Sequence, residues 1–129
     1  MKTIFTPRAP KPAGHYEQGI VSGNMLYISG QLPVDPEQPE LFIDDYRKQA
    51  QQVLNNIDAV LKAAGASRSQ VVRMTVYITD IALWPEINRV YGEFFGEHRP
   101  ARTIVPVPCL HYGYSVEMDG TAELDYKET

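Results

Sequence analysis

Hydrophobic residues recur along the chain with two different periods, and the longer period predicts helices. Between residues 43 and 64 they return every three or four positions, the spacing of one face of an α-helix: Ile43, Tyr46, Ala50, Val53, Leu54, Ile57, Val60, Leu61 and Ala64. Asp44 or Asp45 is suited to cap its start, and Gly65 to end it. Polar residues between these positions, Asp58 among them, are expected to face solvent. A second helix is predicted over residues 82–95, with Pro85 in its first turn.

The shorter period predicts strands. In residues 70–78 and 114–124, apolar and polar side chains alternate, so that each strand has one face toward a core. In the first of these, Val72, Met74, Val76 and Ile78 are expected on one face and Val71, Arg73, Thr75 and Tyr77 on the other. Residues 24–30 and 102–107 are shorter strand candidates. Residues 7–14 and 31–40 contain three prolines each, which predicts loops.

The order of these elements predicts a single domain over residues 1–129. Strands alternating with two helices, followed by two further strands, indicate an α+β sandwich in which one sheet carries both helices on one face. The opposite face of the sheet is expected to be polar, with Arg73, Thr75, Tyr77, Arg102, Glu117, Asp119 and Thr121. Such a face either meets solvent or turns toward another subunit.

Composition excludes several classes of protein. The chain has 129 residues, 43% of them hydrophobic, and a net charge of −4 without a basic run, so nucleic acid is not an expected partner. The single cysteine, Cys109, cannot form a disulfide within the chain. No apolar stretch has the length of a membrane span or the form of a signal peptide, which predicts a cytoplasmic protein.

Few residues are candidates for chemistry. The motifs of serine hydrolases, P-loop proteins, zinc proteases and dinucleotide-binding proteins are absent. Arg102 stands next to an apolar run, and a buried arginine needs a partner. Glu117 and Asp119 lie two residues apart on a predicted strand, on one face. An ion pair within the sheet, between Arg102 and either carboxylate, is the simplest structural explanation. Tyr16 offers a phenol.

Several segments together resemble the RidA (YjgF/L-PSP) family of reactive-intermediate deaminases. They are AGHYEQG (13–19), GNMLYISGQLPVDP (23–36), the helix pattern Q-x-x-x-V-L-N-N-I (49–57), INRVYGEFF (87–95) and PARTIV (100–105). The resemblance runs in order from about residue 4 to residue 124. It implies a chorismate-mutase-like α+β sandwich with a mixed sheet. It also implies a homotrimer with a central β-barrel and with sites between subunits.

The resemblance also implies a reaction, hydrolysis of 2-imino (enamino) acids to 2-oxo acids and ammonia without a cofactor or a metal. Arg102 stands at the family's carboxylate-binding position, and a guanidinium holds a carboxylate through two hydrogen bonds. Aligning VEMDGTA places Asp119 where the family has a glutamate that exchanges a proton with water. Further matches to site positions follow the same blocks: Tyr16, Ser29, Gly30, Asn88 and, through its backbone carbonyl, Ile104.

Two departures leave the substrate open. Asp119 is one methylene shorter than glutamate, and Ile104 replaces a frequent cysteine. The leading hypothesis is a deaminase of 2-aminoacrylate and 2-iminobutanoate type. The alternatives are a pathway-specific deaminase of a larger enamino acid, of aminomuconate type or in pyrimidine breakdown, and a non-catalytic trimer that binds a small carboxylate. Some members of the family are labelled endoribonucleases, which the acidic charge balance disfavours here.

Overall fold

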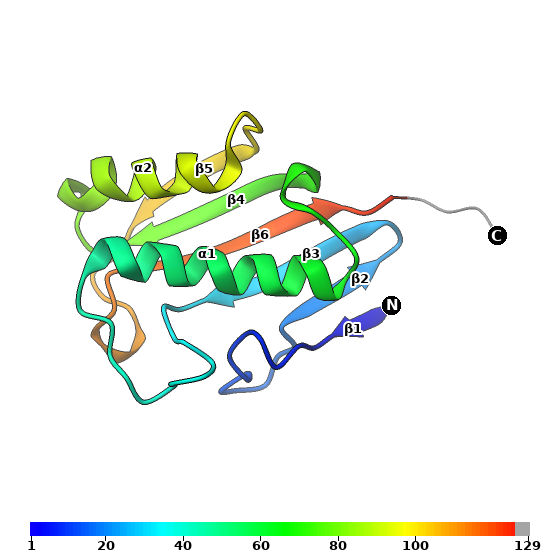
Figure 1. Ribbon diagram of the computed structural model, residues 1–129, viewed down its shortest axis with the longest axis horizontal. Helices are drawn as coiled ribbons and strands as arrows, with labels where there is room; N and C mark the ends of the chain where they lie inside the picture. The colour runs from blue at the N-terminus through cyan, green and yellow to red at the C-terminus, as the bar shows by residue number, and fades with distance from the viewer. Residues whose placement is uncertain (126–129) are drawn as a thin grey trace.

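The computed structural model describes residues 1–125, which form one six-stranded mixed sheet with two α-helices (Figure 1). The strand order is β1-β2-β3-β6-β4-β5, and every neighbouring pair is antiparallel except β4 and β5. The strands are β1 (Lys2–Ile4), β2 (Gly19–Ser22), β3 (Met25–Gln31), β4 (Val71–Ile78), β5 (Ala101–Pro106) and β6 (Val116–Glu123). The α+β class and the mixed sheet predicted from the sequence are confirmed. The two strands before β3 were not specified, because Lys2–Ile4 and Gly19–Ser22 are too short to show a period.

Helix α1 (Tyr46–Ala63) begins three residues later than the apolar pattern predicts. The carboxylate of Asp45 accepts a hydrogen bond from the backbone N–H of Arg47, which makes Asp45 rather than Asp44 the cap. Its predicted stripe is buried as expected. Asp58, however, is only 8% exposed, because Lys62 and Arg68 both reach it with nitrogens at 2.8 and 3.2 Å. The prediction that Asp58 faces solvent is therefore wrong.

Strands β4 and β5 are parallel and are joined by helix α2 (Trp84–Phe95), which follows a short 3₁₀ turn at Ile81–Leu83. The predicted second helix is thus split between a 3₁₀ turn and an α-helix. Strand β6 pairs with β3 on one side and β4 on the other, so the last two strands are not neighbours. Strand β5 is consequently an edge strand of the sheet.

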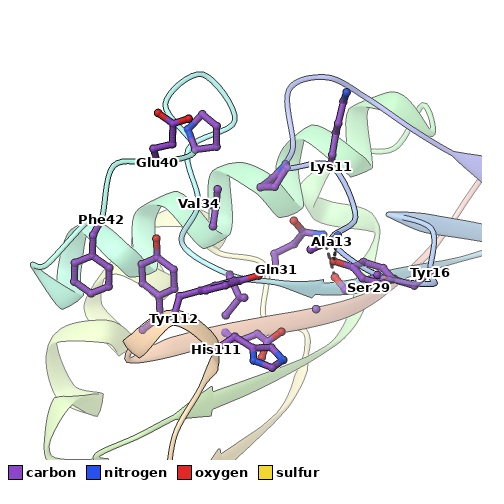
Figure 2. A pocket seen from close by; sticks show the side chains of 17 residues that line it. Lys11, Ala13, Tyr16, Ser29, Gln31, Val34, Glu40, Phe42, His111 and Tyr112 are labelled. Carbon is purple, nitrogen blue, oxygen red and sulfur yellow. Dashed lines mark hydrogen bonds between the residues drawn. The ribbon is translucent and has the colours of Figure 1, made fainter.

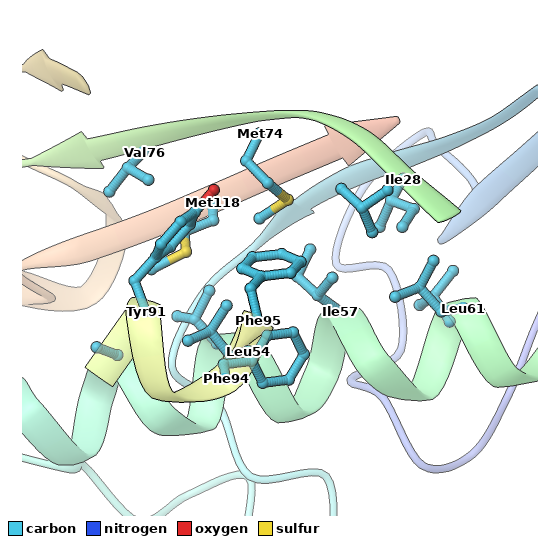
Figure 3. Close-up of a cluster of buried hydrophobic side chains, with 14 of the residues drawn as sticks. Ile28, Leu54, Ile57, Leu61, Met74, Val76, Tyr91, Phe94, Phe95 and Met118 are labelled. Atoms are coloured by element: carbon cyan, nitrogen blue, oxygen red, sulfur yellow. The ribbon is translucent and has the colours of Figure 1, made fainter. Parts of the chain in front are cut away.

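The core lies between the two helices and one face of the sheet (Figure 3). Leu54, Ile57 and Leu61 of α1 are fully buried, as are Met74 of β4 and Met118 of β6. Helix α2 adds Tyr91, Phe94 and Phe95. The ring centre of Phe95 lies 4.9 Å from the ring centres of both Tyr91 and Phe94. Both helices therefore pack on the same face, as the sequence predicts. In residues 1–125 no helix combines the length and apolar character needed to cross a bilayer.

Two irregularities in the strands change which side chains face outward. The pairing of β4 with β6 slips between Val71 and Arg73, so Val71 is buried while Val72 is 42% exposed. This reverses the faces predicted for these two residues. In β3, the three steps from Ile28 to Gln31 oppose only two steps of β6, from Gly120 to Met118. One extra residue is accommodated at Ser29–Gly30, a β-bulge of the kind often found beside binding sites.

Candidate functional site

A cavity of about 750 Å³ opens where β3 ends and β6 begins (Figure 2). Strand residues Ser29, Gly30 and Glu117 form part of its wall. Two loops complete it, one between β1 and β2 and the other between β3 and α1. The residues that these loops and the chain before β6 contribute include Lys11, Ala13, Gly14, Tyr16, Val34, Pro39, Phe42, His111, Tyr112 and Tyr114.

Buried side-chain amides hold both loops in place. Gln18 is 1% exposed, and its amide accepts the N–H of Thr6 at 2.7 Å and donates to the carbonyls of Thr6, Ala9 and Pro10. Asn56 of α1 donates to the carbonyls of Leu32 and Val34 at 3.1 and 3.0 Å. Proline-rich segments have few N–H groups of their own to fix a conformation. The hydrogen bonds of these amides therefore fix the loop conformations.

The bulge in β3 brings its backbone against the carboxyl group of Glu117. A β-carbon built on Gly30 would lie 2.6 Å from Oε2 of Glu117, too close for any side chain unless the carboxyl group moves. Glycine at position 30 thus provides the space in which the Glu117 carboxyl group lies. The predicted site residue Gly30 does line the cavity, and its partner there is Glu117.

The environment of Glu117 favours its protonated form. Burial raises the pKa of this carboxyl group above its usual range, and the negative charge of Asp119 adds to the rise, whereas the positive charge of His111 opposes it. A carboxyl group with a raised pKa inside a cavity is a candidate for proton transfer.

Tyr16 and Ser29 lie together at one end of the cavity, where Figure 2 also shows Ala13. The phenol oxygen of Tyr16 accepts a hydrogen bond from the backbone N–H of Ala13 at 3.4 Å, and its side chain remains 48% exposed. The hydroxyl of Ser29 donates to the carbonyl of Glu17 at 2.6 Å. The sequence therefore predicted three wall residues that the structure brings together: Tyr16, Ser29 and Gly30.

Asp119 lies outside this group. It is on the same face of β6 as Glu117, but its Oδ2 accepts a hydrogen bond from the hydroxyl of Tyr77 at 3.1 Å, and it does not line the cavity. Burial raises the pKa of Tyr77, and the hydrogen bond to Asp119 adds to the rise. The residue expected to exchange a proton with water thus points to β4, and the acid at the cavity is its neighbour two positions earlier.

A second group lies at the β5 edge of the sheet, away from the cavity. It consists of Arg102 and Ile104 of β5 and Asn88 of α2. Arg102 pairs with the buried Met74, so its side chain lies on the helix-covered side of the sheet. The sequence analysis placed it on the polar face, and that prediction is wrong. There its Nη1 donates to Oδ1 of Asn88 at 3.0 Å. The guanidinium also lies over the rings of Trp84 and Tyr91, at 4.7 and 5.1 Å from their centres. Ile104 is half-buried two positions farther along β5.

The ion pair considered for Arg102 is therefore not seen. In the described part of the chain Arg102 forms no ion pair with Glu117 or Asp119, because β4 lies between β5 and β6. Arg102 also does not line the cavity of this chain, and its expected place in a site between subunits stays a prediction. Strands β5 and β6 are separated by two strand spacings, which is about 10 Å.

Sequence reasoning gave no site role to an aromatic group at the far end of the cavity. Phe42 and Tyr114 are stacked with ring centres 4.8 Å apart, and Tyr112 meets Tyr114 edge to face at 6.4 Å. His111 lies 5.8 Å from the Tyr112 ring. The HYGY run at 111–114 is an aromatic cluster beside a glycine, and this could have marked it as a binding loop. Within residues 1–125, no three His, Cys, Asp or Glu side chains gather as metal ligands.

A family model supports the resemblance carried by the sequence blocks. The model described as endoribonuclease L-PSP matches residues 6–124. Among similar chains, a RutC family protein of Pyrococcus abyssi is 44% identical over 127 residues, which is 98% of both chains. TdcF of Escherichia coli, described as a candidate reactive intermediate deaminase, is 40% identical over 124 residues, covering 94% of this chain and 95% of TdcF.

Solved structures agree with the fold. The crystal structure of E. coli TdcF with bound serine superimposes with a TM-score of 0.92 at 39% identity, covering 97% of this chain and all of that one. A Thermotoga maritima protein described as a candidate endoribonuclease gives a TM-score of 0.93 at 38% identity, covering 98% and 99% of the two chains.

Proposed function

The chain belongs to the endoribonuclease L-PSP family, which includes RutC- and RidA-type proteins, and on that premise we propose that it hydrolyses reactive 2-imino acids to 2-oxo acids and ammonia. The observation that carries the proposal is the half-buried Glu117 carboxyl group, which lies against Gly30 in a cavity also lined by Tyr16 and Ser29. A relative described as a reactive intermediate deaminase and a relative with bound serine support a small amino-acid-like substrate.

Glu117, rather than Asp119, is the acid in this proposal. Glu117 lines the cavity and carries a raised pKa, whereas Asp119 is engaged by Tyr77. As a carboxylate, Glu117 removes a proton from a water molecule while the water oxygen forms a bond to the imine carbon. That proton passes to the imine nitrogen and gives a carbinolamine. Glu117 then takes the proton of the carbinolamine hydroxyl and delivers it to the nitrogen, so that the carbon–nitrogen bond breaks and ammonia leaves as the carbonyl forms. One water is consumed and no electrons are exchanged.

Arg102 of a second protomer supplies the cation. In residues 1–125 the Arg102 side chain forms one hydrogen bond, to Asn88, which leaves other N–H donors of its guanidinium available to a carboxylate. The flat faces of Trp84 and Tyr91 orient the guanidinium without using its donors. In an assembly of identical subunits, a heterologous contact can bring Arg102 of one chain to the cavity of the next. The expected homotrimer has three such sites.

The test is a coupled reaction in which a threonine dehydratase releases 2-iminobutanoate. Added protein is expected to accelerate the appearance of 2-oxobutanoate, and Arg102→Ala to lose at least about a hundredfold in this increment, since an unpaired substrate carboxylate costs roughly 2–5 kcal/mol. Arg89→Ala is the matched control. Arg89 lies on α2 next to Asn88 but pairs with Glu86 and Glu93 at the surface. An equal increment from wild type and Arg102→Ala would contradict the proposal.

Two other functions lead to different results. If the protein only binds a small carboxylate, 2-oxobutanoate raises its melting temperature but no increment in product is measured. Cleavage of RNA is disfavoured by the net charge of −4, since RNA binding needs a basic surface. RNA cleavage that is lost on mutation of Glu117 would reverse this judgement.

A further inference from the structure

The cavity has two ends of different chemistry. Figure 2 shows Tyr16 and Ser29 at one end and Phe42 and Tyr112 at the other. Apolar side chains of the loop after β3, among them Leu32, Val34 and Pro39, also line it. A substrate whose polar atoms meet the first end therefore directs the remainder of its structure along apolar walls.

The aromatic end is an ordered surface rather than a group of loose side chains. Its base is Tyr114, which is 4% exposed and against which Phe42 lies almost parallel, with 12° between the ring planes. Tyr112 stands at 80° to the Tyr114 ring. Phe42 and Tyr112 remain 46% and 67% exposed. Two open aromatic faces over a buried third one form a receptacle for a flat or bulky apolar group.

The backbone of Tyr112 is in a strained conformation. Its φ and ψ are 63° and 15°, in the left-handed region, and it is the one non-glycine residue with a positive φ among residues 1–125. A side chain with a β-carbon in this region costs about 1 kcal/mol or more. The ring contacts of Tyr112 with His111 and Tyr114 still leave 67% of the residue exposed and free to meet a ligand. A ligand contact is the use that such strain commonly has.

The length of the cavity fits a large side chain better than a small one. Tyr114 precedes Glu117 by three residues with a bend at Ser115, so the backbone positions of Tyr114 and Glu117 lie at most roughly 10 Å apart. The methyl or ethyl group of 2-iminopropanoate or 2-iminobutanoate, bound with its imine carbon near Glu117, does not reach the aromatic end. A benzyl or isobutyl group extends toward it and leaves less of the 750 Å³ cavity to water.

We propose that Phe42, Tyr112 and Tyr114 form a side-chain subsite that makes the protein prefer 2-imino acids with aromatic or branched apolar side chains over those with methyl or ethyl groups. The inference rests on the proposed imine hydrolysis, whose substrate class it specifies. The enzymes that supply such imines are those that oxidise large apolar amino acids.

The experiment compares imines generated in place by an amino-acid oxidase from phenylalanine, leucine and 2-aminobutanoate. The kcat/KM for the phenylalanine-derived imine is expected to exceed that for 2-iminobutanoate by about tenfold, the usual effect of filling an apolar pocket. Tyr112→Asn and Phe42→Ala should each reduce this ratio severalfold. Asparagine is chosen because it tolerates positive φ, so that the ring is removed while the backbone conformation is retained. Leu41→Ala, an exposed neighbour of Phe42 outside the cavity, should leave the ratio unchanged.

A binding measurement separates this inference from the proposed function. Calorimetry with the products phenylpyruvate and 2-oxobutanoate is expected to show tighter binding of phenylpyruvate. If phenylpyruvate binds tighter but no imine is hydrolysed, the subsite stands and the proposed function fails. If imines are hydrolysed with a ratio at or below one, or if phenylpyruvate binds no tighter, the subsite is overturned. The latter result would indicate that another part of the assembly covers the aromatic end.

Discussion

The two groups of predicted site residues lie in different parts of the chain, and each lacks a group that the other has. The cavity beside β3 and β6 has an acid, Glu117, with a phenol and a glycine backbone around it, but the described part of the chain places no arginine there. The edge formed by β5 and α2 has an oriented arginine, Arg102, which contacts Asn88 and two aromatic rings but does not line the cavity with Glu117. Each part contains what the other lacks.

On the proposed function, this difference means that each chain carries two half-sites. Arg102 stands on the end strand and on the helix-covered side of the sheet, while Glu117 points to the other side, two strands away. No rotation of side chains joins them within one chain. The proposed function therefore requires a head-to-tail contact that brings the β5 edge of one chain to the cavity of the next, and contacts of this kind can close into rings.

The largest expected effect separates the two acids on β6. Glu117→Gln should lower kcat by at least about a hundredfold, the usual contribution of a proton-transferring side chain. Asp119→Asn should stay within about threefold of wild type, because a neutral amide still accepts the hydrogen bond of the Tyr77 hydroxyl. Steady-state kinetics with 2-iminobutanoate measure both. The reverse order would return the acid role to Asp119.

The folding of Glu117→Gln provides the control. Because its pKa is raised in the folded state, any contribution of Glu117 to stability is fully present below the unfolded pKa and is lost as the pH rises through the folded pKa. At neutral pH the neutral glutamine is therefore expected to melt no lower than wild type. A large loss of melting temperature would mean that the kinetic loss reflects unfolding.

An intermediate effect tests the space beside Glu117. Gly30→Ala inserts a methyl group where the Glu117 carboxyl oxygen lies 2.6 Å away, so the carboxyl group must move. Displacement of a reacting group by about 1 Å costs on the order of a hundredfold in rate, and we expect a loss of tenfold or more in kcat. Gly92→Ala in α2 is the control, because its new methyl group meets no atom within 4 Å. That variant should keep its activity and gain about 0.5–1 kcal/mol of stability.

The smallest effect is a shift in pH dependence. Glu117 acts as a carboxylate, so kcat/KM falls as the pH drops through its raised pKa. The positive charge of His111 lowers this pKa, so His111→Ala should move the acidic limb of the profile to higher pH. Glu117→Gln should remove the limb. An unchanged limb in His111→Ala would show that the two groups are not coupled.

The regular elements could be predicted from the sequence because their periods are long enough to read. The stripe from Tyr46 to Leu61 and the alternation from Val116 to Ala122 predicted the buried faces of these segments correctly, whereas Asp58 on the polar face of the helix is buried. The bulges could not be predicted, because an extra residue changes pairing without changing composition. Val71 and Val72 are chemically identical, and only the pairing of β4 with β6 decides which one is buried.

Three residues that line the cavity were predicted from the sequence, but the arrangement of the other candidate residues was not. Tyr16, Ser29 and Gly30 were identified through sequence blocks, and the structure gathers them. The choice between Glu117 and Asp119 depends on which of two side chains on one face meets the bulge and which meets Tyr77. The side of the sheet taken by Arg102 depends on the parallel register that pairs it with Met74. Neither is encoded in local spacing.

The account's central claim, that one site is built from two chains, is tested most directly by mixing inactive variants. Arg102→Ala and Glu117→Gln chains, co-expressed in equal amounts, form mixed assemblies in which half of the chains supply an intact Arg102 and half an intact Glu117. About one quarter of wild-type activity is expected, since about one site in four combines the two intact partners. Activity no higher than that of the separate variants would contradict the claim and would place Arg102 and Glu117 in the same chain's site or in none.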